Sequence, residues 1–567
     1  MADIVLTTLN AKYIHPAFGL RYLLANLGPL RPRACLLEFD INQRPIDIVE
    51  VILARNPKII GFGVYIWNVG PTTEVLAAIK RVRPDITLIL GGPEVSYEVE
   101  TQPIVQLADY VITGEADLKL AALCQQLLWG EPAGAKILPA QAPDLSQLVL
   151  PYDLYDDEDV AHRIIYIEAS RGCPFTCEFC LSSLDIPVRQ APLATLLEHL
   201  QRLLDRGVKQ FKFVDRTFNL NLSVSRTILE FFLERYQPGQ FIHFEMVPDR
   251  LPEGLRQIVA AFPPGALQFE VGIQTFNEEV SSLIQRRQNY QRLEENLNFL
   301  RRHTGVYIHA DLIAGLPGES LESFAAGFDR LVALGPQEIQ VGLLKRLRGT
   351  PIVRHNLEWQ MAYNPNPPYE ILQNKLIDFA TMQKVRRFAR YWDLIGNSGN
   401  FVETTPLIWS EAGPASRLSP TSTSNSQKAA KPAALESVSN QAGAARTSAL
   451  PSPFHAFMRW SEWLHGHVGR TDGIALVRLM ELLFNYLTGQ LNLGAQSIAE
   501  VMWRDYQRGG RRDNPRFLKN LLLPDAQPAS PRRSRLDLPK RQARHLVQQR
   551  GQALKAPGAP SSTRWSL

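Results

Sequence analysis

The sequence predicts an α/β protein: a doubly wound domain, a partial six-stranded β/α barrel, and an α-helical C-terminal region. Two series of short apolar runs alternate with amphipathic segments, and an acidic, Pro-rich stretch separates the two series. A Ser- and Ala-rich segment then precedes the last helical segments. The chain has 567 residues, enough for about three to four domains. We expect the following parts: a first domain 1–135, a linker 136–160, the barrel 161–355, a helical extension 356–410, a disordered linker 411–452, a helical unit 453–523 and a basic disordered tail 524–567.

The first series predicts a parallel sheet with helices on both faces. Its apolar runs are nearly continuous and lie at 4–9, 34–41, 58–67, 86–92 and 109–115. The segments 18–27, 73–82 and 116–128 between them have helical periodicity. Strands of this kind are typical of a sheet that is buried on both sides. Such domains bind ligands at the carboxyl ends of their strands.

The loops after these strands indicate what kind of ligand the domain takes. No G-x-G-x-x-G and no P-loop follow a strand, which disfavours a dinucleotide or a nucleoside triphosphate. Glycines allow a ligand to approach the backbone, and aromatic side chains can cover a flat macrocycle. Tight strand-to-helix turns also need glycine, so a purely structural role is an equal alternative. The candidate binding residues are Asn10, Pro16, Tyr65, Trp67, Gly91, Gly92, Pro93, Gly114 and Glu115.

The second series predicts the barrel. We expect its strands at 163–170, 210–215, 241–247, 266–273, 306–315 and 338–344. Six β/α units rather than eight favour an open, partial barrel, with chemistry at the carboxyl ends of the strands. Lys345, Arg346 and Arg348 follow the last strand, where they would either meet an anionic substrate or lie on a solvated loop.

The C-terminal third changes in character along its length. Residues 366–395 have a helical pattern, 411–452 contain few large apolar residues, and 453–522 regain Leu and aromatic content. The segment 501–567 carries 15 Lys and Arg against four acidic residues, all of them Asp. A basic tail can bind nucleic acid or stay solvated without a partner, and we favour the second.

Composition excludes several classes of protein. Hydrophobic residues make up 45% and charged residues 21% of the chain, as in ordinary globular proteins. The sequence has no run of about 18 apolar residues, so we expect no membrane span. The N-terminus lacks the pattern of a secretory signal. Five cysteines are too few for a disulfide framework, so we expect the protein to reside in the reducing cytoplasm.

Three of the five cysteines form the pattern that carries chemistry. Cys173, Cys177 and Cys180 are spaced C-x-x-x-C-x-x-C directly after the first barrel strand. Thiolates bind zinc or iron–sulfur clusters, but a structural zinc site needs four ligands. Three cysteines on a four-iron cluster leave one iron open, as a catalytic cluster requires. The alternatives are a zinc site completed by His162 or His243, and chance clustering. Cys35 and Cys124 lie on apolar segments and are expected in the core.

The segment from Ser170 to Cys180, with Phe179 before the third cysteine, resembles the signature of radical S-adenosylmethionine (SAM) enzymes. Segments 213–219, 270–275 and 313–319 are similar to three later barrel segments of that family. The resemblance implies a 4Fe–4S cluster on the three cysteines. It places SAM against Phe179, Asp215, Glu270, Gln274, Ile313 and Gly315. Asp215 would accept a hydrogen bond from the SAM amino group, or instead pair with Arg216.

The resemblance extends upstream. Segments 91–96 and 111–117 are similar to the Rossmann-like, cobalamin-binding domain that precedes one large radical SAM subgroup. The nine loop residues named above then become candidate cobalamin ligands. The D-x-H-x-x-G pattern of many cobalamin domains is missing, since His15 lies in a different context, so no histidine ligand to cobalt is expected. A scaffold domain without cobalamin is the alternative. The C-terminal helices resemble an uncharacterised extension of some members.

The function implied is reductive cleavage of SAM to a 5′-deoxyadenosyl radical. With cobalamin, this would lead to methylation or another transformation of an unactivated carbon. A reductant protein such as flavodoxin or ferredoxin and an unknown substrate are the expected partners, with no membrane. One alternative is a radical SAM enzyme that modifies RNA and is anchored by the basic tail. Another is a non-catalytic cobalamin or iron–sulfur sensor.

Overall fold

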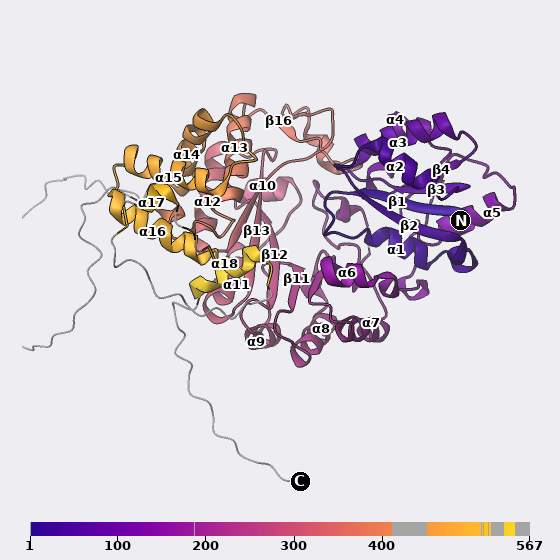
Figure 1. Cartoon of the computed structure of the whole chain (residues 1–567), viewed down its shortest axis with the longest axis horizontal. Helices are drawn as coiled ribbons and strands as arrows, with labels where there is room; N and C mark the ends of the chain where they lie inside the picture. Colours follow the sequence, from indigo (N-terminus) through magenta and orange to yellow (C-terminus); the bar gives the residue numbers. More distant parts are fainter. Residues whose placement is uncertain are drawn as a thin grey trace, which may run out of the picture. The chain divides into compact units, whose positions relative to one another are not determined.

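The computed structural model describes residues 2–185, 187–410, 451–511, 513, 515–519, 521–522 and 538–549. The chain divides into two compact units (Figure 1). Residues 1–400 together with 530–567 form unit 1, and residues 401–529 form unit 2. The predicted disordered linker 411–452 lies outside the described residues, apart from its last two.

The first domain is a six-stranded parallel sheet in the order β2-β1-β3-β4-β5-β6. Each predicted strand is present. The apolar run of β1 is fully buried between helices on both faces, whereas the edge strand β2 is half-buried. Leu and Ile side chains of α1 and α5 pack on one face, and those of α2, α3 and α4 pack on the other. The strands are β1 (Ile4–Asn10), β2 (Ala34–Asp40), β3 (Ile59–Gly63), β4 (Thr87–Gly91), β5 (Tyr110–Thr113) and β6 (Ile137–Pro139). The helices are α1 (Phe18–Ala25), α2 (Pro45–Leu53), α3 (Val69–Val82), α4 (Pro103–Leu107) and α5 (Lys119–Leu128), with short 3-10 turns η1 (Gly28–Arg33), η2 (Pro93–Val95) and η3 (Val99–Thr101).

The barrel is a second six-stranded parallel sheet, in the sequential order β14-β13-β12-β11-β10-β7. Since β7 and β14 are the two edges of this order, the barrel is partial, as predicted (Figure 1). Its strands are β7 (Ile165–Ile167), β10 (Gln210–Phe213), β11 (Phe241–Met246), β12 (Leu267–Gln274), β13 (Tyr307–Ala314) and β14 (Glu338–Leu343). Its helices are α7 (Leu193–Asp205), α8 (Leu222–Glu234), α9 (Glu253–Ala261), α10 (Glu278–Leu283), α11 (Tyr290–His303) and α12 (Leu321–Leu334), with turns η6 (Leu181–Leu184), η7 (Phe218–Leu220) and η8 (Pro351–His355).

The predicted linker 136–160 is more ordered than expected. Strand β6 extends the first sheet, and η4 (Leu145–Gln147), η5 (Tyr152–Leu154) and α6 (Asp157–His162) follow it. The hydroxyl of buried Tyr152 accepts a hydrogen bond from the backbone N–H of Glu168 at 3.0 Å. The aromatic residues of this segment therefore fix the entry to the barrel, a role that its Pro and Asp content concealed.

Two further predictions need correction. Helix α13 begins at Phe379 and ends at Ile395, because Pro367 and Pro368 cannot continue a helix and β16 (Ile371–Gln373) pairs with β15 (Ala362–Tyr363). The described part of the predicted disordered tail contains α18 (Lys540–Gln549). Arg541 lies 3.1 Å from Glu338 at the start of β14, and Gln542 donates to Gln268 of β12 at 2.9 Å. These partners order a segment whose own sequence has little apolar content.

Unit 2 contains helices α14 (Pro453–Val468), α15 (Leu476–Gly489), α16 (Ala495–Arg508) and α17 (Arg516–Lys519), and the turn η9 (Thr405–Ile408). Its core includes Trp460 and the Leu residues of α15, in agreement with the predicted helical unit. Asp505 is buried and accepts hydrogen bonds from the backbone N–H groups of Glu403 and Thr404.

Candidate functional site

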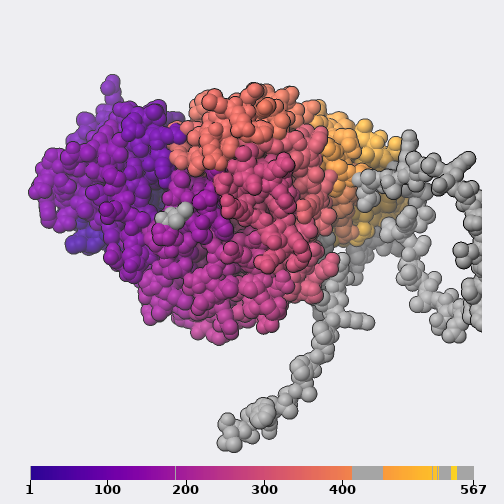
Figure 2. Space-filling view, turned by 180° about the vertical axis from the view of Figure 1, so that it is seen from behind, coloured from indigo at the N-terminus to yellow at the C-terminus, as the bar shows by residue number. Residues whose placement is uncertain are grey.

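The carboxyl edges of the two sheets in unit 1 face one another, because ion pairs join the loops that follow their strands. Arg346 and Arg348, after β14, lie 2.7 Å from Glu98 and 2.8 Å from Glu94, after β4. In Figure 2 the salmon surface of the later barrel loops meets the violet surface of the first domain. Arg346 and Arg348 are therefore held in domain contacts, which corrects their expected roles on a substrate or on a solvated loop.

A cavity of about 320 Å³ lies between the first sheet and its helices α1 and α5, and it reaches the carboxyl edge. Strand β3 leaves room for the cavity because it has glycine at positions 61 and 63, without side chains that would fill it. A Cβ at Gly61 would lie 3.0 Å from Leu6 Cδ2, and one at Gly63 would lie 3.4 Å from Leu20 Cδ2. Gly92 has a φ of +109°, and a Cβ there would lie 2.5 Å from Val64 O, so the turn requires glycine. The cavity lies beside the point where strand order reverses, at β1 and β3, which is where doubly wound sheets bind ligands.

Five of the nine candidate residues of the first domain line this cavity: Tyr65, Gly91, Gly92, Gly114 and Glu115. The other four do not. Asn10 donates to Glu38, and Pro16 is buried ahead of α1. Trp67 stacks on Tyr65 at 4.5 Å, and Pro93 begins η2. An amphipathic helix and a glycine in an apolar strand give no local sign of a ligand, so the sequence did not predict the lining residues on α1 and β3. These residues are Phe18, Gly19, Tyr22, Gly61 and Gly63.

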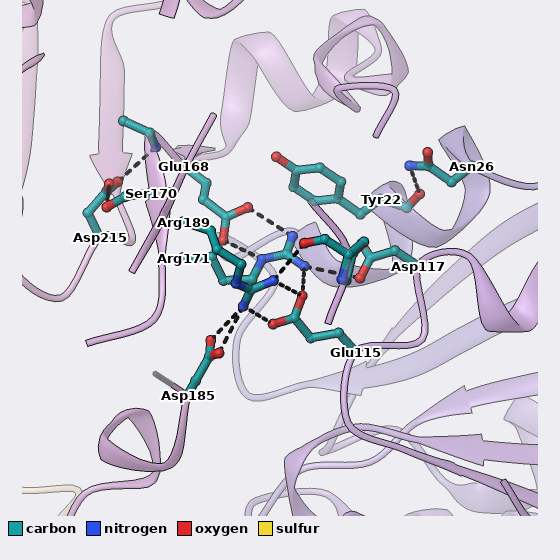
Figure 3. A network of polar contacts seen from close by, with 12 residues as sticks. Tyr22, Asn26, Glu115, Asp117, Glu168, Ser170, Arg171, Asp185, Arg189 and Asp215 are labelled. Atoms are coloured by element: carbon teal, nitrogen blue, oxygen red, sulfur yellow. Dashed lines mark hydrogen bonds and ion pairs between the residues drawn. The ribbon is translucent and has the colours of Figure 1, made fainter. Parts of the chain in front are cut away.

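Arg171 directly precedes the cysteine loop and also lines this cavity. Figure 3 shows the polar contacts around it. Its guanidinium lies 2.7 Å from Glu115, 3.0 Å from Asp117 and 2.9 Å from Glu168, and it contacts the ring of Tyr22. All five side chains also line the cavity. Burial alone would lower the pKa of Arg171, but the three carboxylates outweigh it and raise that pKa. Arg171 is therefore a permanent cation in the wall of the cavity.

Glu115 holds both strands of the hairpin that begins and ends the cysteine loop. This hairpin pairs β8 (Ser170–Arg171) with β9 (Arg189–Gln190). Arg189 contacts Glu115 and lies 2.8 Å from Asp185, whose carbonyl accepts the N–H of Cys173 at 3.0 Å. Burial would raise the pKa of Glu115, but Arg189 and Arg171 lower it on balance. Glu115, predicted as a ligand contact, is thus also a structural link between the domains.

The three cysteines lie on the loop between β8 and β9, at the carboxyl end of β7. All three are free thiols; Cys173 and Cys177 are buried and Cys180 is half-buried. Burial raises the pKa of the Cys173 and Cys177 thiols in the metal-free chain. The loop is anchored by buried Glu178, which lies 2.7 Å from His355 Nε2 and also pairs with Arg354. Glu178 was missed because its partners are about 180 residues away along the chain.

The zinc alternative finds no support in the described part of the chain. No group of three or more His, Cys, Asp or Glu there is arranged around a point that could hold one metal ion. His162 lies 3.7 Å from Glu158, and His243 lies 2.9 Å from Glu270. A four-iron cluster, in contrast, binds each cysteine through a different iron and does not need the sulfurs to meet at one ion.

Asp215 lies beside the cysteine loop, at the carboxyl end of β10. Its carboxylate accepts hydrogen bonds from Ser170 Oγ at 2.6 Å and from the N–H of Ala169 at 3.0 Å (Figure 3). Burial raises the pKa of Asp215 to about 7, against the opposing effect of these two donors. The alternative ion pair with Arg216 is not formed, since Arg216 lies 2.8 Å from Glu245.

The other predicted SAM contacts are spread along the carboxyl half of the barrel. Glu270 pairs with His243 and with Lys212 at 3.5 Å, inside the barrel. Gln274 has a φ of 72°, and its buried Oε1 has no hydrogen-bond partner. Ile313 and Phe179 pack against the same apolar cluster, and Gly315 has a φ of +88° with Ile371 beside its Cα. Of these, the unpartnered Gln274 Oε1 is an open acceptor for a bound polar group.

Arg286 was not predicted, yet it lies next to the cysteines. Its Nη1 is 3.5 Å from Cys177 Sγ, its Nη2 donates to Gly272 O, and its buried Nε has no hydrogen-bond partner. Buried donors and acceptors without partners are costly, so a cluster of them at a strand edge fits a polar ligand. The residues present therefore suit a cluster with a bound polar cofactor.

Comparison with known families agrees with this geometry. Residues 4–124 match the family model "B12 binding domain", residues 167–331 match "Radical SAM superfamily", and residues 357–415 match "Protein of unknown function (DUF4080)". The chain is a radical SAM protein with an N-terminal B12-binding domain. The two models imply a 4Fe–4S cluster and SAM in the barrel, and cobalamin in the first domain.

Solved structures of radical SAM enzymes share the fold. The cobalamin-dependent enzyme OxsB covers 91% of this radical SAM protein and 82% of its own chain, with a TM-score of 0.55 at 14% identity. TsrM from Kitasatospora setae, solved with cobalamin and a [4Fe-4S] cluster, covers 62% and 74%, with a TM-score of 0.50 at 18% identity. A curated relative, the uncharacterised methyltransferase PH0819 of Pyrococcus horikoshii, is 28% identical over 199 residues. The match covers 31% of this chain and 43% of that relative, which is less than half of its length.

Among the described residues of this radical SAM protein, no helix is both long and apolar enough to cross a bilayer.

Filling the first cavity is expected to block cobalamin without unfolding the protein. In Gly63→Leu, the new Cβ makes ordinary contacts and the rest of the side chain occupies the cavity. We expect cobalt per chain to fall at least about tenfold, as one displaced apolar group costs a few kcal/mol of binding. Gly70→Leu, at an exposed position on α3 with open space around it, is the control. Equal cobalt content in the two variants would contradict the placement.

Proposed function

We propose that this radical SAM protein is an enzyme that methylates an unactivated carbon, with SAM as both radical source and methyl source. The observation that carries the proposal is the Arg171 contact. Arg171, the last residue of β8 before the cysteine loop, is also part of the wall of the first cavity. This supports a shared space onto which both cofactor sites would open. When bound, the cluster and SAM supply a radical that removes a hydrogen atom from carbon, and cobalamin supplies the methyl group.

The chain's own residues have distinct tasks in this proposal. Cys173, Cys177 and Cys180 hold the cluster, and Glu178 and Asp185 fix the loop that carries them. Asp215 accepts from the SAM amino group, and Gln274 offers its free Oε1 to a SAM hydroxyl or amino group. Phe179 and Ile313 provide the apolar surface next to the cluster. The ion pairs of Arg346 and Arg348 hold the two carboxyl edges together beside the reaction space.

The test needs no known substrate. The protein, purified anaerobically with iron and cobalamin supplied, is given SAM and either dithionite or reduced flavodoxin. We expect 5′-deoxyadenosine from reductive cleavage, and S-adenosylhomocysteine up to about one per bound cobalt from methylation of the corrinoid. Gly63→Leu should lose the second product and keep the first. Cleavage without S-adenosylhomocysteine in cobalt-loaded protein would exclude methyl transfer, and no cleavage at all would favour a sensor.

The role of Asp215 predicts a pH dependence of SAM binding. With a pKa of about 7, its carboxyl group is about one-tenth ionised at pH 6 and about nine-tenths ionised at pH 8. If the ionised form accepts from the SAM amino group, SAM affinity should rise about tenfold between these pH values. Asp215→Asn should bind SAM more weakly at pH 8 and lose this rise. SAM affinity is measured by equilibrium dialysis for the wild type and for Asp215→Asn. Any titration of SAM itself affects both proteins equally, so the difference between them reports on Asp215.

The RNA alternative is weakened by the described part of the tail. Arg541 contacts Glu338 and Asp393, and Arg544 donates to Ser398 O at 2.9 Å. These two cations are thus held by the protein. The hypothesis also names four other basic residues of the tail. Lys540 begins α18, and Arg532, Arg533 and Arg535 lie outside the described residues.

A further inference from the structure

The first cavity is too small for a whole cobalamin. Its volume of about 320 Å³ corresponds to about ten water-sized groups, which is the size of one bicyclic aromatic base and far less than a corrin ring. Cobalamin carries such a base, a dimethylbenzimidazole, at the end of its nucleotide tail. The part of the cofactor that fits this cavity is therefore the base.

We propose that the first cavity selects among corrinoids by the chemistry of this base. It accepts a benzimidazole whose outer edge is apolar, and it discriminates against one that carries a hydroxyl group on that edge. The inference goes beyond the proposed function, because it concerns which corrinoid the chain binds and does not depend on methyl transfer.

The inner part of the cavity, here called the apolar interior, has no polar side chain in its lining. Leu6, Gly61 and Ile89 are neighbours in the register, in the middle of β1, β3 and β4. The backbone N–H and C=O groups of strands and helices are engaged in their own hydrogen bonds, so the apolar interior offers no partner to a polar group on a base. The residues of the apolar interior are Leu6, Leu20, Leu23, Gly61, Ile89, Ile112 and Leu120.

The charged residues of the lining lie at the carboxyl edge, beyond the ends of the strands. Glu115 and Asp117 follow β5, and Glu168 follows β7. Arg171 ends β8 and lies within 3.0 Å of all three carboxylates. The positions of the lining residues along their strands thus separate the apolar interior from an ionic mouth.

Tyr65 provides one hydrogen-bond donor to the cavity. Its hydroxyl oxygen lies 3.5 Å from the position that a Cβ at Gly19 of α1 would occupy, and both residues line the cavity. This hydroxyl has no hydrogen-bond partner among the described residues, and burial raises the pKa of Tyr65, so it stays protonated. A buried donor without a partner favours a ligand with an acceptor. The ring nitrogen that benzimidazole bases have in common is such an acceptor.

The selection follows from the cost of burying a hydroxyl group. A methyl group on the outer edge of the base gains free energy when it enters the apolar interior. A hydroxyl group of similar size loses its hydrogen bonds to water there and finds none in exchange. Apolar sites discriminate between such isosteres by up to about a hundredfold.

Three corrinoids test the inference by equilibrium dialysis against the full chain: the 5-methylbenzimidazole cobamide, its 5-hydroxy counterpart, and cobinamide, which has no base. The methyl form should bind at least about tenfold more tightly than the hydroxy form. Cobinamide should bind at least about tenfold more weakly than the methyl form. Equal affinity for the methyl and hydroxy forms would overturn the inference. Cobinamide that binds as tightly as the methyl form would also overturn it, because the base would then not occupy the cavity.

Two neighbours on β5 provide matched variants. The Ile112 side chain lines the cavity, whereas the Val111 side chain packs on the opposite face of the sheet, and both are buried. Ile112→Thr places a hydroxyl in the apolar interior and should reduce the preference for the methyl form by about two- to tenfold. Val111→Thr should keep the preference. The inference fails if the two variants have the same preference.

A second pair of variants tests the donor. Tyr65→Phe should weaken the methyl and hydroxy forms by about two- to tenfold and leave cobinamide unchanged. Tyr13→Phe, which removes an exposed hydroxyl that contacts Glu158 away from the cavity, is the control. The comparison of the three corrinoids on the wild type decides the inference even if a variant does not fold. All readouts are binding constants, so a failure of SAM cleavage or methyl transfer is recognised separately.

Discussion

Replacing Cys173, Cys177 or Cys180 with alanine is expected to reduce iron in the anaerobically purified protein from about four atoms per chain to background. Reductive cleavage of SAM should be lost completely at the same time. Each cysteine binds a different iron of a four-iron cluster, so two remaining thiolates leave two irons without a protein ligand. Iron and sulfide analysis, the absorbance of the cluster and the yield of 5′-deoxyadenosine measure the effect.

Cys35→Ala is the matched control, since Cys35 is a half-buried thiol on β2, far from the loop in sequence. It should keep full iron and full cleavage. The assignment would be wrong if Cys35→Ala lost iron as severely as the three loop variants. It would also be wrong if one of the loop variants retained four irons and normal cleavage.

Arg171→Met is expected to cost about 3–5 kcal/mol of folding free energy, the range found when one partner of a buried ion pair is removed. The Arg171 side chain is 16% exposed, and its loss leaves Asp117 and Glu168, which are 7% and 9% exposed, without their cation. Cobalt content should fall as well, because Arg171 lines the first cavity. Denaturant unfolding and cobalt analysis provide the two readouts.

The pH dependence of this effect has a definite sign. The folded chain lowers the pKa of Glu115, so its ion pairs contribute stability above the ordinary carboxyl pKa and lose it as pH falls through the lowered value. The wild-type advantage over Arg171→Met should therefore shrink toward acidic pH. The control is Arg44→Met, which breaks an exposed ion pair with Asp47 and should leave stability unchanged. Equal stability of the two variants at neutral pH would refute the buried network.

The parts that follow from local pattern agree with the structure. Both parallel sheets are formed by apolar runs whose burial on two faces is visible in the sequence itself, as in fully buried β1. The cysteine spacing identifies the loop, and glycines at 91, 92 and 114 identify turns that line a cavity. The sequence pattern did not predict elements whose stabilising partners lie far away along the chain. The sequence of Lys540–Gln549 looks like a solvated tail because Glu338 and Gln268, which hold it, are about 200 or more residues earlier.

In the candidate site, too, local sequence predicted some residues, while the contacts that depend on distant parts of the chain were not predicted. Asp215 was correctly singled out as a buried acid at a strand end, but its donors Ser170 and Ala169 follow from how β7 lies beside β10. Glu115 was taken for a ligand contact, whereas its ion pairs with Arg171 and Arg189 depend on how the two domains pack. Arg286 and Glu178 carry no local signal, because an Arg or Glu in a loop is ordinary until its neighbours in space are known.

The position of α18 affects the order in which the protein can fold during its synthesis. The helix belongs to unit 1, but the ribosome makes it after all of unit 2. At about 5–20 residues per second, the roughly 140 residues between α13 and α18 take about seven to thirty seconds to translate. During that time Glu338, which is 3% exposed in the finished protein, has no Arg541 beside it. The nascent barrel therefore has Glu338 paired with His309 at 3.3 Å but not yet with Arg541, and this end of β14 is completed only when the last helix arrives.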